Sequence, residues 1–354
     1  MSAHKYAYLK PGHYARGWHV VLFSQELAVG EAKKLLYFQR HLVAYRGESG
    51  RVAVVDAHCP HLGANLASGE GRITGDNIAC PFHGWTFAPS GECVDIPYAS
   101  TIPNKAKHAL KGWPVVEKNG FIALWYDPEN GEPEHYLPAI PEWQRDGWGD
   151  WQFHRSRIRA KACDVIENIV DIAHFPHVHG GNVQSFENRF GARSVTQLST
   201  VKRDLQARMI IPPGAPFDLE DAREEAGSDA DAWGDATYHG PSIMYYYTES
   251  RHPDIGFRSW WVNCHTPVND DELDLCSAVI ISTLDELPLP QEFLHMYPQM
   301  AHTAFGQDVE IWKDKIYRED PILCDGDGPI NKLRRWYEQF FLPRQASPQR
   351  KASA

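Results

Sequence analysis

The chain has 354 residues, of which 43% are hydrophobic and 12 are tryptophan, so it can bury one large core or two ordinary ones. A formal net charge of −11 argues against a nucleic-acid-binding protein, whose binding face would be basic. No run approaches the roughly 20 apolar residues that span a bilayer, and the first residues do not resemble a signal peptide, so we expect a cytoplasmic protein without a transmembrane segment.

Short runs of β-branched and aromatic residues, separated by turns, fill the chain from about residue 17 to 126. They predict a small antiparallel β domain, to which we assign residues 1–126 together with an N-terminal extension. Residues 127–150 are rich in Pro and Gly and show little periodicity. This composition predicts a crossing between two domains.

The second domain, residues 151–354, is predicted to combine longer strands with a few helices, which makes the fold α+β. Strand patterns occupy residues 192–211, 236–250, 258–268 and 273–283, and helical patterns occupy residues 164–176, 289–317 and 331–340. The acidic stretch 218–235 is interpreted as a mobile surface loop, with a lid over a pocket as the alternative.

The cysteines are seven in number and scattered, which argues against a disulfide framework. Only Cys59 and Cys80 lie close to a histidine. The other five are interpreted as small buried hydrophobic residues: Cys93, Cys163, Cys264, Cys276 and Cys324.

Two Cys and two His form mixed pairs on Gly-rich loops. Cys59 and His61 are one residue apart, Cys80 and His83 are two residues apart, and 18 residues separate the pairs. Zinc is one interpretation, because two Cys and two His can close a tetrahedral site. Zinc sites usually pair Cys with Cys and His with His, however, whereas each loop here offers one of each.

The mixed pairs favour a Rieske [2Fe–2S] cluster, in which one iron takes two thiolates and the other takes two imidazoles. Each loop would then span both irons, with Cys59 and Cys80 on the buried metal and His61 and His83 on the outer one. An imidazole edge would remain at the surface for electron exit.

A second group of candidate ligands lies in residues 163–181, where Asp171, His174, His177 and His179 are crowded together. His174 and His177 share a helical face only if the helix continues past Pro176, which proline disfavours. A helix that ends near Pro176 would instead leave His174 on its last turn and His179 on the following loop. Those two imidazoles would then be able to bind one ion.

Two imidazoles and one carboxylate form the facial triad of non-haem Fe(II) oxygenases. The distant carboxylate has three candidates on the helical pattern 302–320, namely Asp308, Glu310 and Asp314. Helical periodicity by itself favours none of the three strongly.

The motifs "CPH…CPFHGW" (59–85) and "NIVDIAHFPHVH" (168–179) together resemble the Rieske non-haem iron oxygenases over nearly the whole chain. The resemblance implies an N-terminal antiparallel β Rieske domain and a C-terminal helix-grip catalytic domain with an antiparallel sheet. It implies that His174, His179 and Asp308 bind a mononuclear Fe(II), whereas His177 matches no family ligand and is interpreted as a packing or pocket residue.

A narrower resemblance concerns the substrate. Residues 307–340 resemble the oxygenase component of 3-ketosteroid 9α-hydroxylases, and residues 59–85 also resemble the Rieske segment of cholesterol 7-desaturases. Both groups act on steroids. The resemblance implies the terminal oxygenase of a multicomponent monooxygenase that uses O2 to hydroxylate a hydrophobic, steroid-like substrate.

The family resemblance also implies a homotrimer in which His83 of one subunit approaches Asp171 of the next, making Asp171 an electron bridge between subunits. The sequence shows neither a strand-turn-helix GxGxxG nor a flavin-binding pattern. Electrons are therefore expected from a separate NAD(P)H-dependent reductase, with or without a ferredoxin.

Three alternatives remain open at this point. A Rieske desaturase or an O- or N-demethylase would carry the same metals and act on another hydrophobic substrate. A Rieske-type electron-transfer protein would explain residues 1–126 but would leave the second group of ligands without a purpose. A binding protein with a structural zinc would contain no iron–sulfur cluster.

Overall fold

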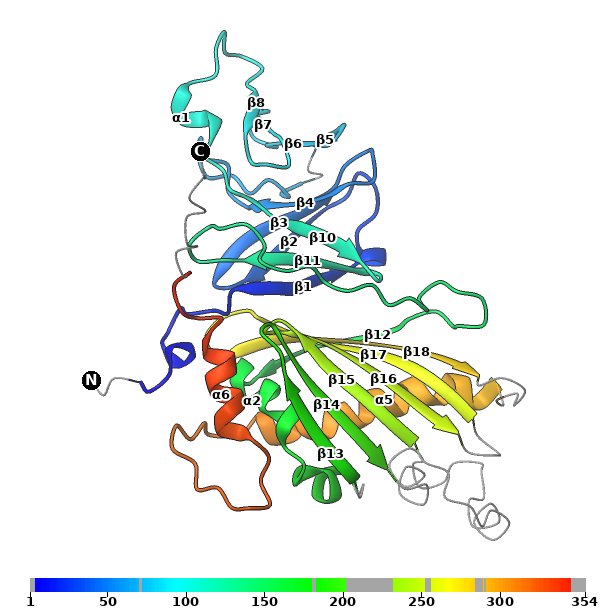
Figure 1. The fold of residues 1–354 in the computed structure, drawn as a ribbon. Coiled ribbons are helices and arrows are strands. Elements are labelled where there is room, and N and C mark those ends of the chain that lie inside the picture. Colours follow the sequence, from blue (N-terminus) through cyan, green and yellow to red (C-terminus); the bar gives the residue numbers. More distant parts are fainter. Residues whose placement is uncertain are drawn as a thin grey trace, which may run out of the picture.

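The computed structural model describes residues 4–69, 72–179, 183–201, 232–251, 256–283, 289 and 291–344. Within these ranges the strands form antiparallel sheets, three of them from strands up to residue 126 and one from strands after residue 150 (Figure 1). The predicted α+β class with antiparallel sheets is therefore confirmed. No helix in the described ranges has both the length and the apolar character needed to cross a membrane.

The N-terminal sheets are small. The first has the order β1 (Gly17–Phe23), β11 (Phe121–Tyr126) and β10 (Val115–Lys118). The second has the order β2 (Ala32–Tyr37), β3 (Arg40–Arg46), β4 (Val52–Asp56) and β9 (Gly112–Trp113). The third has the order β5 (Arg72–Thr74), β6 (Asn77–Ala79), β7 (Thr86–Phe87) and β8 (Cys93–Asp95), and the short helix α1 (Asn104–Lys107) follows it in the chain.

Strands β1 and β11 are buried along their whole length. Alternate side chains of a strand point to opposite faces, and here both faces are covered. Val21 and Leu124 belong to a core shared with β3 and β4, whereas Val20 and Trp125 belong to a core shared with the large C-terminal sheet. The two strands therefore form a layer between the cluster-bearing part of the chain and the C-terminal part.

The C-terminal sheet has seven strands. Their order is β12 (Gln152–Arg159), β18 (Glu272–Thr283), β17 (Gly256–Pro267), β16 (Ile243–Arg251), β15 (Ala232–His239), β14 (Ser194–Val201) and β13 (Val183–Phe190). The long helix α5 (Gln291–Trp312) packs on this sheet, with Phe293 and Tyr297 in one core with Phe257 and Ile281. This is the helix-grip arrangement that the resemblance implied.

The remaining helices differ partly from the prediction. The terminal helix is α6 (Ile330–Glu338). The helix predicted over 164–176 is shorter, because α2 (Ala162–Glu167) continues only as the 3-10 turn η3 (Asn168–Val170). The prediction past Val170 was wrong, since Asp171 is extended and a separate π-helical turn, η4 (Phe175–His179), follows.

Two smaller predictions also need correction. Cys324 was predicted to be buried but is exposed, because it lies on the loop between α5 and α6. The other six cysteines are buried. Of the predicted acidic surface loop 218–235, residues 232–235 belong to strand β15, and residues 218–231 lie outside the described chain.

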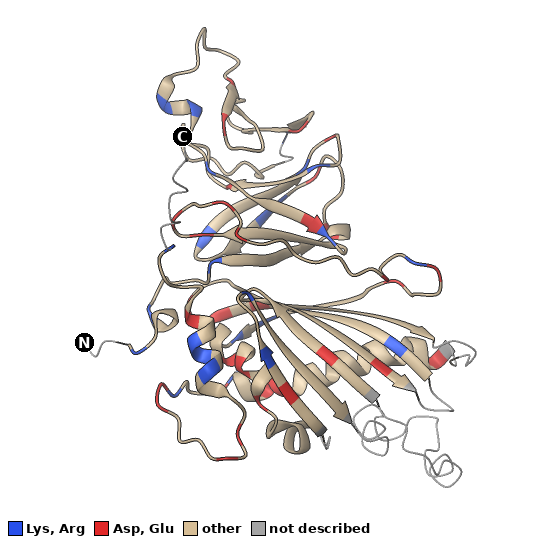
Figure 2. Cartoon of the chain, in the orientation of Figure 1, with Lys and Arg blue, Asp and Glu red and all other residues tan. Residues whose placement is uncertain are grey.

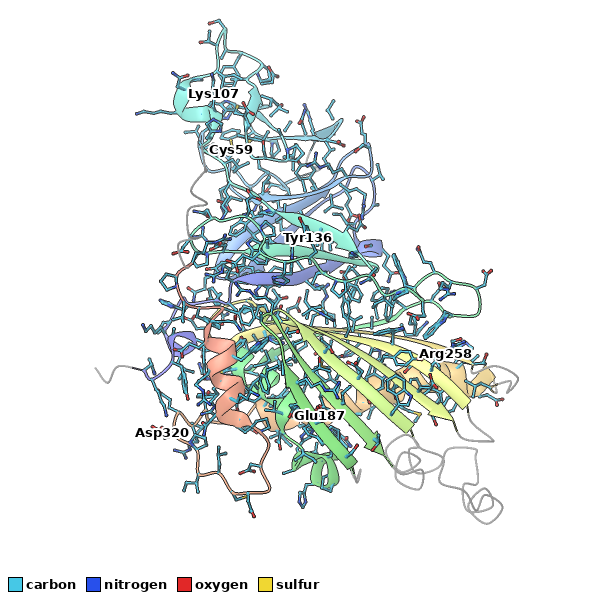
Figure 3. All side chains as sticks on the ribbon, viewed as in Figure 1. Cys59, Lys107, Tyr136, Glu187, Arg258 and Asp320 are labelled. Atoms are coloured by element: carbon cyan, nitrogen blue, oxygen red, sulfur yellow. The ribbon has the colours of Figure 1, made fainter. Side chains whose placement is uncertain are left out.

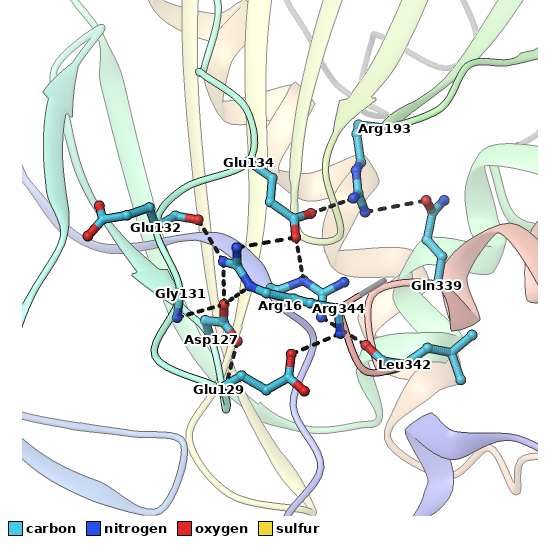
Figure 4. Close-up of polar contacts among 10 residues, drawn as sticks. All are labelled: Arg16, Asp127, Glu129, Gly131, Glu132, Glu134, Arg193, Gln339, Leu342 and Arg344. Carbon is cyan, nitrogen blue, oxygen red and sulfur yellow. Dashed lines mark hydrogen bonds and ion pairs between the residues drawn. The ribbon is translucent and has the colours of Figure 1, made fainter. Parts of the chain in front are cut away.

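Residues 127–150 connect the two parts, and ion pairs tie this segment to both chain ends (Figure 4). Glu134 pairs with Arg16 at 3.2 Å and with Arg193, and Asp127 accepts a hydrogen bond from Nε of Arg344 at 2.6 Å. Leu137 and Ile140 of the same segment lie in the core below β1 and β11. The boundaries 1–126, 127–150 and 151–354 remain a prediction.

Candidate iron sites

The four candidate cluster ligands lie on two loops with the same backbone hydrogen bonds. In each loop the amide of the cysteine, Cys59 or Cys80, donates to the carbonyl five residues on, at 2.8 Å. The amide of the glycine four residues on, Gly63 or Gly84, donates back to the cysteine carbonyl at 2.9 Å. Both glycines have positive φ, 78° and 76°, which closes the turn at little steric cost.

The loops bring their four side chains together. The thiols of Cys59 and Cys80 are buried, whereas His61 and His83 are partly exposed, with their ring centroids 4.7 Å apart. The His61 ring also stacks on Trp85 at 4.9 Å. This arrangement of inner sulfurs and outer imidazoles is the one that the mixed pairs predicted.

Two observations test whether an iron–sulfur cluster fits these loops. Nδ1 of His61 is buried and has no hydrogen-bond partner in the described chain, as expected of a nitrogen that another group must satisfy. Burial raises the pKa of the Cys59 thiol to about 11, so a metal would have to displace its proton. Two thiolates and two imidazoles suit a Rieske cluster, and the loops fit it.

The two loops carry no charged side chain and expose several apolar ones. Residues 57–69 and 77–91 contain no Asp, Glu, Lys or Arg, and Figure 2 shows charged segments on the neighbouring elements, including the two lysines of α1. Leu62, Phe82 and Tyr98 are more than half exposed there, and Tyr98 accepts a 2.7 Å hydrogen bond from Trp85. We call Leu62, Phe82 and Tyr98 the tip surface, and such an exposed apolar patch is typical of a protein contact.

The second group of ligands is built by the turn η4 and the helix α5. The turn places His174 just before its first residue and His179 at its last, with the two rings 5.2 Å apart. Helix α5 carries the buried Asp308, whose Oδ1 lies 3.3 Å from Nε2 of His179. The ligand atoms of these three residues all lie within 4.8 Å of one another.

The structure thus places Asp308 beside the two histidines, whereas Glu310 and Asp314 are exposed. His177 is exposed on the turn and does not line the adjoining cavity, so its interpretation as a packing or pocket residue was wrong.

Hydrogen bonds hold both imidazoles in one tautomer. Nδ1 of His174 lies 2.6 Å from the backbone carbonyl of Asp171, and Nδ1 of His179 lies 2.9 Å from Oε1 of Gln307. A carbonyl oxygen only accepts, so each Nδ1 donates and Nε2 is the ring nitrogen left for a metal. At His179 burial lowers the pKa, but the hydrogen bond to Asp308 and its charge outweigh burial and raise it, so a metal bound there would displace the Nε2 proton. Burial lowers the pKa of His174 and so favours its neutral form. Two imidazoles that each present Nε2, together with a carboxylate, suit a mononuclear Fe(II), and these residues fit it.

Asp171 has a different role from the three clustered side chains. Its carboxylate Oδ1 accepts the amide of Ala173 at 3.1 Å, and its Oδ2 lies 3.7 Å from Nδ1 of His174. The carboxylate is 39% exposed. Asp171 therefore links the histidine turn to the protein surface, with its backbone carbonyl holding His174.

A cavity of about 180 Å³ adjoins the second group of ligands, between α2, the large sheet and α5. Its wall is mostly apolar and aromatic and includes Tyr238, Met244, Tyr246, Trp261, Met300 and Phe305. Tyr246 and Trp261 are cross-strand neighbours on adjoining strands, so the sheet itself shapes this wall.

Two amide side chains interrupt the apolar wall. Gln197 is 7% exposed and Asn263 is 8% exposed, and both line the cavity. An amide in an apolar cavity wall can donate and accept hydrogen bonds to a bound ligand or to water. Sequence reasoning missed both residues, because Gln and Asn at isolated strand positions resemble ordinary surface residues.

The two candidate sites lie far apart in the molecule (Figure 1). The loops that carry Cys59 project beyond β2–β4, whereas α5 lies on the far side of β1 and β11 (Figure 1). In Figure 3, Cys59 is labelled in the upper part and Glu187, on β13, in the lower part.

Comparisons with known families agree with both parts of the chain. The family model of the Rieske [2Fe-2S] domain matches residues 17–109, and that of the 3-ketosteroid 9alpha-hydroxylase C-terminal domain matches residues 124–341. The resemblance stated from the sequence motifs is therefore confirmed.

Three relatives illustrate the likeness. A "Probable 3-ketosteroid-9-alpha-monooxygenase, oxygenase component" of Rhodococcus rhodochrous is 36% identical over 339 residues, covering 94% of this chain and 81% of the relative. The 3-ketosteroid-9-alpha-monooxygenase oxygenase component of Mycobacterium tuberculosis is 32% identical, covering 94% and 83%. A cholesterol 7-desaturase of Hemicentrotus pulcherrimus is 29% identical, covering 94% and 70%.

Solved structures show the same fold. The chain is similar to dicamba monooxygenase bound to dicamba, with a TM-score of 0.67, 18% identity, and coverage of 93% of this chain and 98% of that one. It is similar to NdmB of Pseudomonas putida CBB5, with a TM-score of 0.66, 17% identity, and coverage of 93% of both chains. The chain belongs to the 3-ketosteroid 9α-hydroxylase family of Rieske non-haem iron monooxygenases.

Proposed function

We propose that this protein is the terminal oxygenase component of a steroid monooxygenase and hydroxylates a 3-ketosteroid-like substrate with O2. The observation that carries the proposal is the apolar cavity beside His174, His179 and Asp308, whose wall presents the two amides of Gln197 and Asn263. A steroid is a rigid apolar body with a few oxygen atoms, and such a wall can bind both parts.

In this proposal Cys59, His61, Cys80 and His83 hold the [2Fe–2S] cluster, and His174, His179 and Asp308 hold the mononuclear Fe(II). When bound, the cluster supplies single electrons and the mononuclear iron supplies the O2 chemistry that attacks a C–H bond.

The protein's own part is to bind, orient and shield the substrate. Tyr246 and Trp261 offer flat apolar surfaces to the rings of the substrate, and the amides of Gln197 and Asn263 offer hydrogen bonds to its oxygens. Met300 and Phe305 of α5 cover the cavity from the side opposite the sheet and help to exclude water.

The proposal includes a homotrimer and separate redox partners. Because three sheets lie between the cluster loops and α5 in one chain, a short electron path needs the tip surface of another subunit. His83 of one subunit would then approach Asp171 of the next. A reductase dependent on NAD(P)H, with or without a ferredoxin, would supply the electrons. None of the seven cysteines pairs with another in a disulfide, which supports the cytoplasm as the compartment.

The test combines iron analysis with product analysis. The purified protein should contain about three irons per chain, and Asp308→Ala should keep only the two of the cluster. With a reductase, NADH and a panel of 3-ketosteroids, we expect a product that has gained one oxygen.

The named alternatives give different results. A product that has lost two hydrogens would instead support a desaturase, which the likeness to the cholesterol 7-desaturase favours as second candidate. Absence of turnover with every steroid would overturn the proposed substrate class, and two irons per chain in the wild-type protein would overturn the oxygenase itself.

A further inference from the structure

Both ring nitrogens of His179 lie against consecutive residues of α5. Nδ1 is 2.9 Å from Oε1 of Gln307, and Nε2 is 3.3 Å from Oδ1 of Asp308. The imidazole therefore bridges the π-helical turn and the helix, with one nitrogen facing each residue. Asp308 lies on the side of the ring that would face the iron, and Gln307 lies on the other side.

We propose that Gln307 is a positioning residue that fixes the tautomer and orientation of His179 for iron binding. The inference rests on the proposed function, since it requires that His179 is an iron ligand. A ligating imidazole needs its lone pair on the nitrogen that faces the metal, so its proton must sit on the other nitrogen. The amide oxygen of Gln307 accepts that proton and offers none in return.

The two histidines differ in the kind of group that accepts their Nδ1 proton. Nδ1 of His174 donates to the backbone carbonyl of Asp171, which no side-chain substitution removes. Nδ1 of His179 donates to the side chain of Gln307. Loss of Gln307 therefore frees the His179 ring to rotate or to change tautomer, while His174 and Asp308 keep their places.

Asn168 supports the third candidate ligand in a similar way. Its Nδ2 donates to Oδ2 of Asp308 at 3.2 Å, which leaves Oδ1 of that carboxylate directed at His179. Helix α5 thus contributes the candidate ligand Asp308 and the positioning residue Gln307. Asn168 of the α2–η3 segment holds Asp308 by a hydrogen bond. Gln307 is exposed, so its hydrogen bond to His179 lies within reach of water.

The experiment compares iron retention in three variants of the complete protein with its cluster in place. Gln307→Leu removes the acceptor, and Gln307→Glu keeps an oxygen in the same position. Gln299→Leu is the matched control, because Gln299 is an exposed glutamine of the same helix. The measured quantities are the affinity for the third iron against a ferrous chelator, the cluster absorption and the melting temperature.

We expect Gln307→Leu to bind the third iron about tenfold more weakly, with cluster absorption and melting temperature unchanged. Gln307→Glu and Gln299→Leu should bind it like the wild-type protein. Equal iron affinity in Gln307→Leu and wild type would overturn the inference, and so would an equal loss in Gln299→Leu. A wild-type protein without any third iron would overturn the proposed function, and this inference with it.

Discussion

Gly328 lies against the backbone carbonyl of Val170, so close that a Cβ atom at position 328 would stand 1.6 Å from that oxygen. The loop between α5 and α6 therefore presses directly on the segment that leads into Asp171. We predict that Gly328→Ala displaces this segment and with it the turn η4. The variant should lose its mononuclear iron but keep the absorption of the cluster, which lies in the other part of the chain.

The control for this prediction is Gly326→Ala in the same loop, where the nearest atom to an added Cβ is the Cys324 sulfur at 3.9 Å. That variant should retain all its iron. If Gly328→Ala retains it as well, the contact does not set the position of the iron ligands.

Asp171→Asn should separate metal binding from electron transfer. The asparagine Oδ1 can still accept the Ala173 amide, and the backbone carbonyl that holds His174 is unchanged, so the turn should fold normally. The charge that would bridge to a neighbouring cluster is lost. We expect full iron content, a cluster that is reduced normally, and product formation lowered by at least about 100-fold. Wild-type product formation would contradict the bridge.

The amides of Gln197 and Asn263 should make the affinity for a ligand depend on the oxygen atoms that the ligand carries. Asn263→Leu, or Gln197→Leu, replaces a hydrogen-bonding group with an apolar one of similar size. Affinity for a 3-ketosteroid should fall by about tenfold, which corresponds to about 1.4 kcal/mol, whereas affinity for an analogue without the matching oxygen should change little. Binding titrations with both ligands make the comparison.

Met300→Leu is the control for the amide variants, because it changes an apolar wall residue and nearly conserves its volume. It should affect both ligands alike. Equal losses for the oxygenated and the deoxygenated ligand in Asn263→Leu and in Gln197→Leu would show that the amides do not recognise oxygen.

Stability should fall in acid because of two buried histidines. Burial lowers the pKa of His19 to about 4 and that of His265 to about 3, since both side chains are almost fully enclosed. In the unfolded chain both return toward the ordinary value of 6.5. Below that pH the unfolded state binds more protons, so the free energy of unfolding is greatest above pH 6.5 and decreases as the pH falls toward 4.

The slope should approach about 1.4 kcal/mol per pH unit for each of these histidines. Chemical denaturation at several pH values measures it. His265→Gln should reduce the slope, whereas His13→Gln, which changes an exposed histidine, should leave it unchanged. An unchanged slope in His265→Gln would exclude His265 as a source of the acid sensitivity.

The sequence allowed the candidate ligands to be found because their chemistry is local. Cys59 and His61 are recognisable from spacing alone, and so are Cys80 and His83. Asp308 was harder, since periodicity left three acids open and only the family motif separated them. The packing of α5 explains the choice, because it buries Asp308 and leaves Glu310 exposed.

The supporting residues could not be predicted in this way. Gln307 and His179 are 128 residues apart in the chain, and Asn168 and Asp308 are 140 apart, so tertiary packing alone brings them together. The end of the helix at Val170 was also missed, because the apolar pattern continues to Phe175 while Pro176 bars an uninterrupted helix.

Strands β1 and β11 are buried on both faces, and this determines whether residues 1–126 can fold without the rest of the chain. Trp18, Phe121 and Trp125 pack against Val262 and Ala278 of the large sheet, so they belong to a core that residues 1–126 supply only in part. A fragment cut at the crossing would expose this aromatic layer to water and should aggregate. The cluster and the catalytic cavity should therefore unfold as one cooperative unit, and a free-standing electron carrier cannot be excised from this chain by simple truncation.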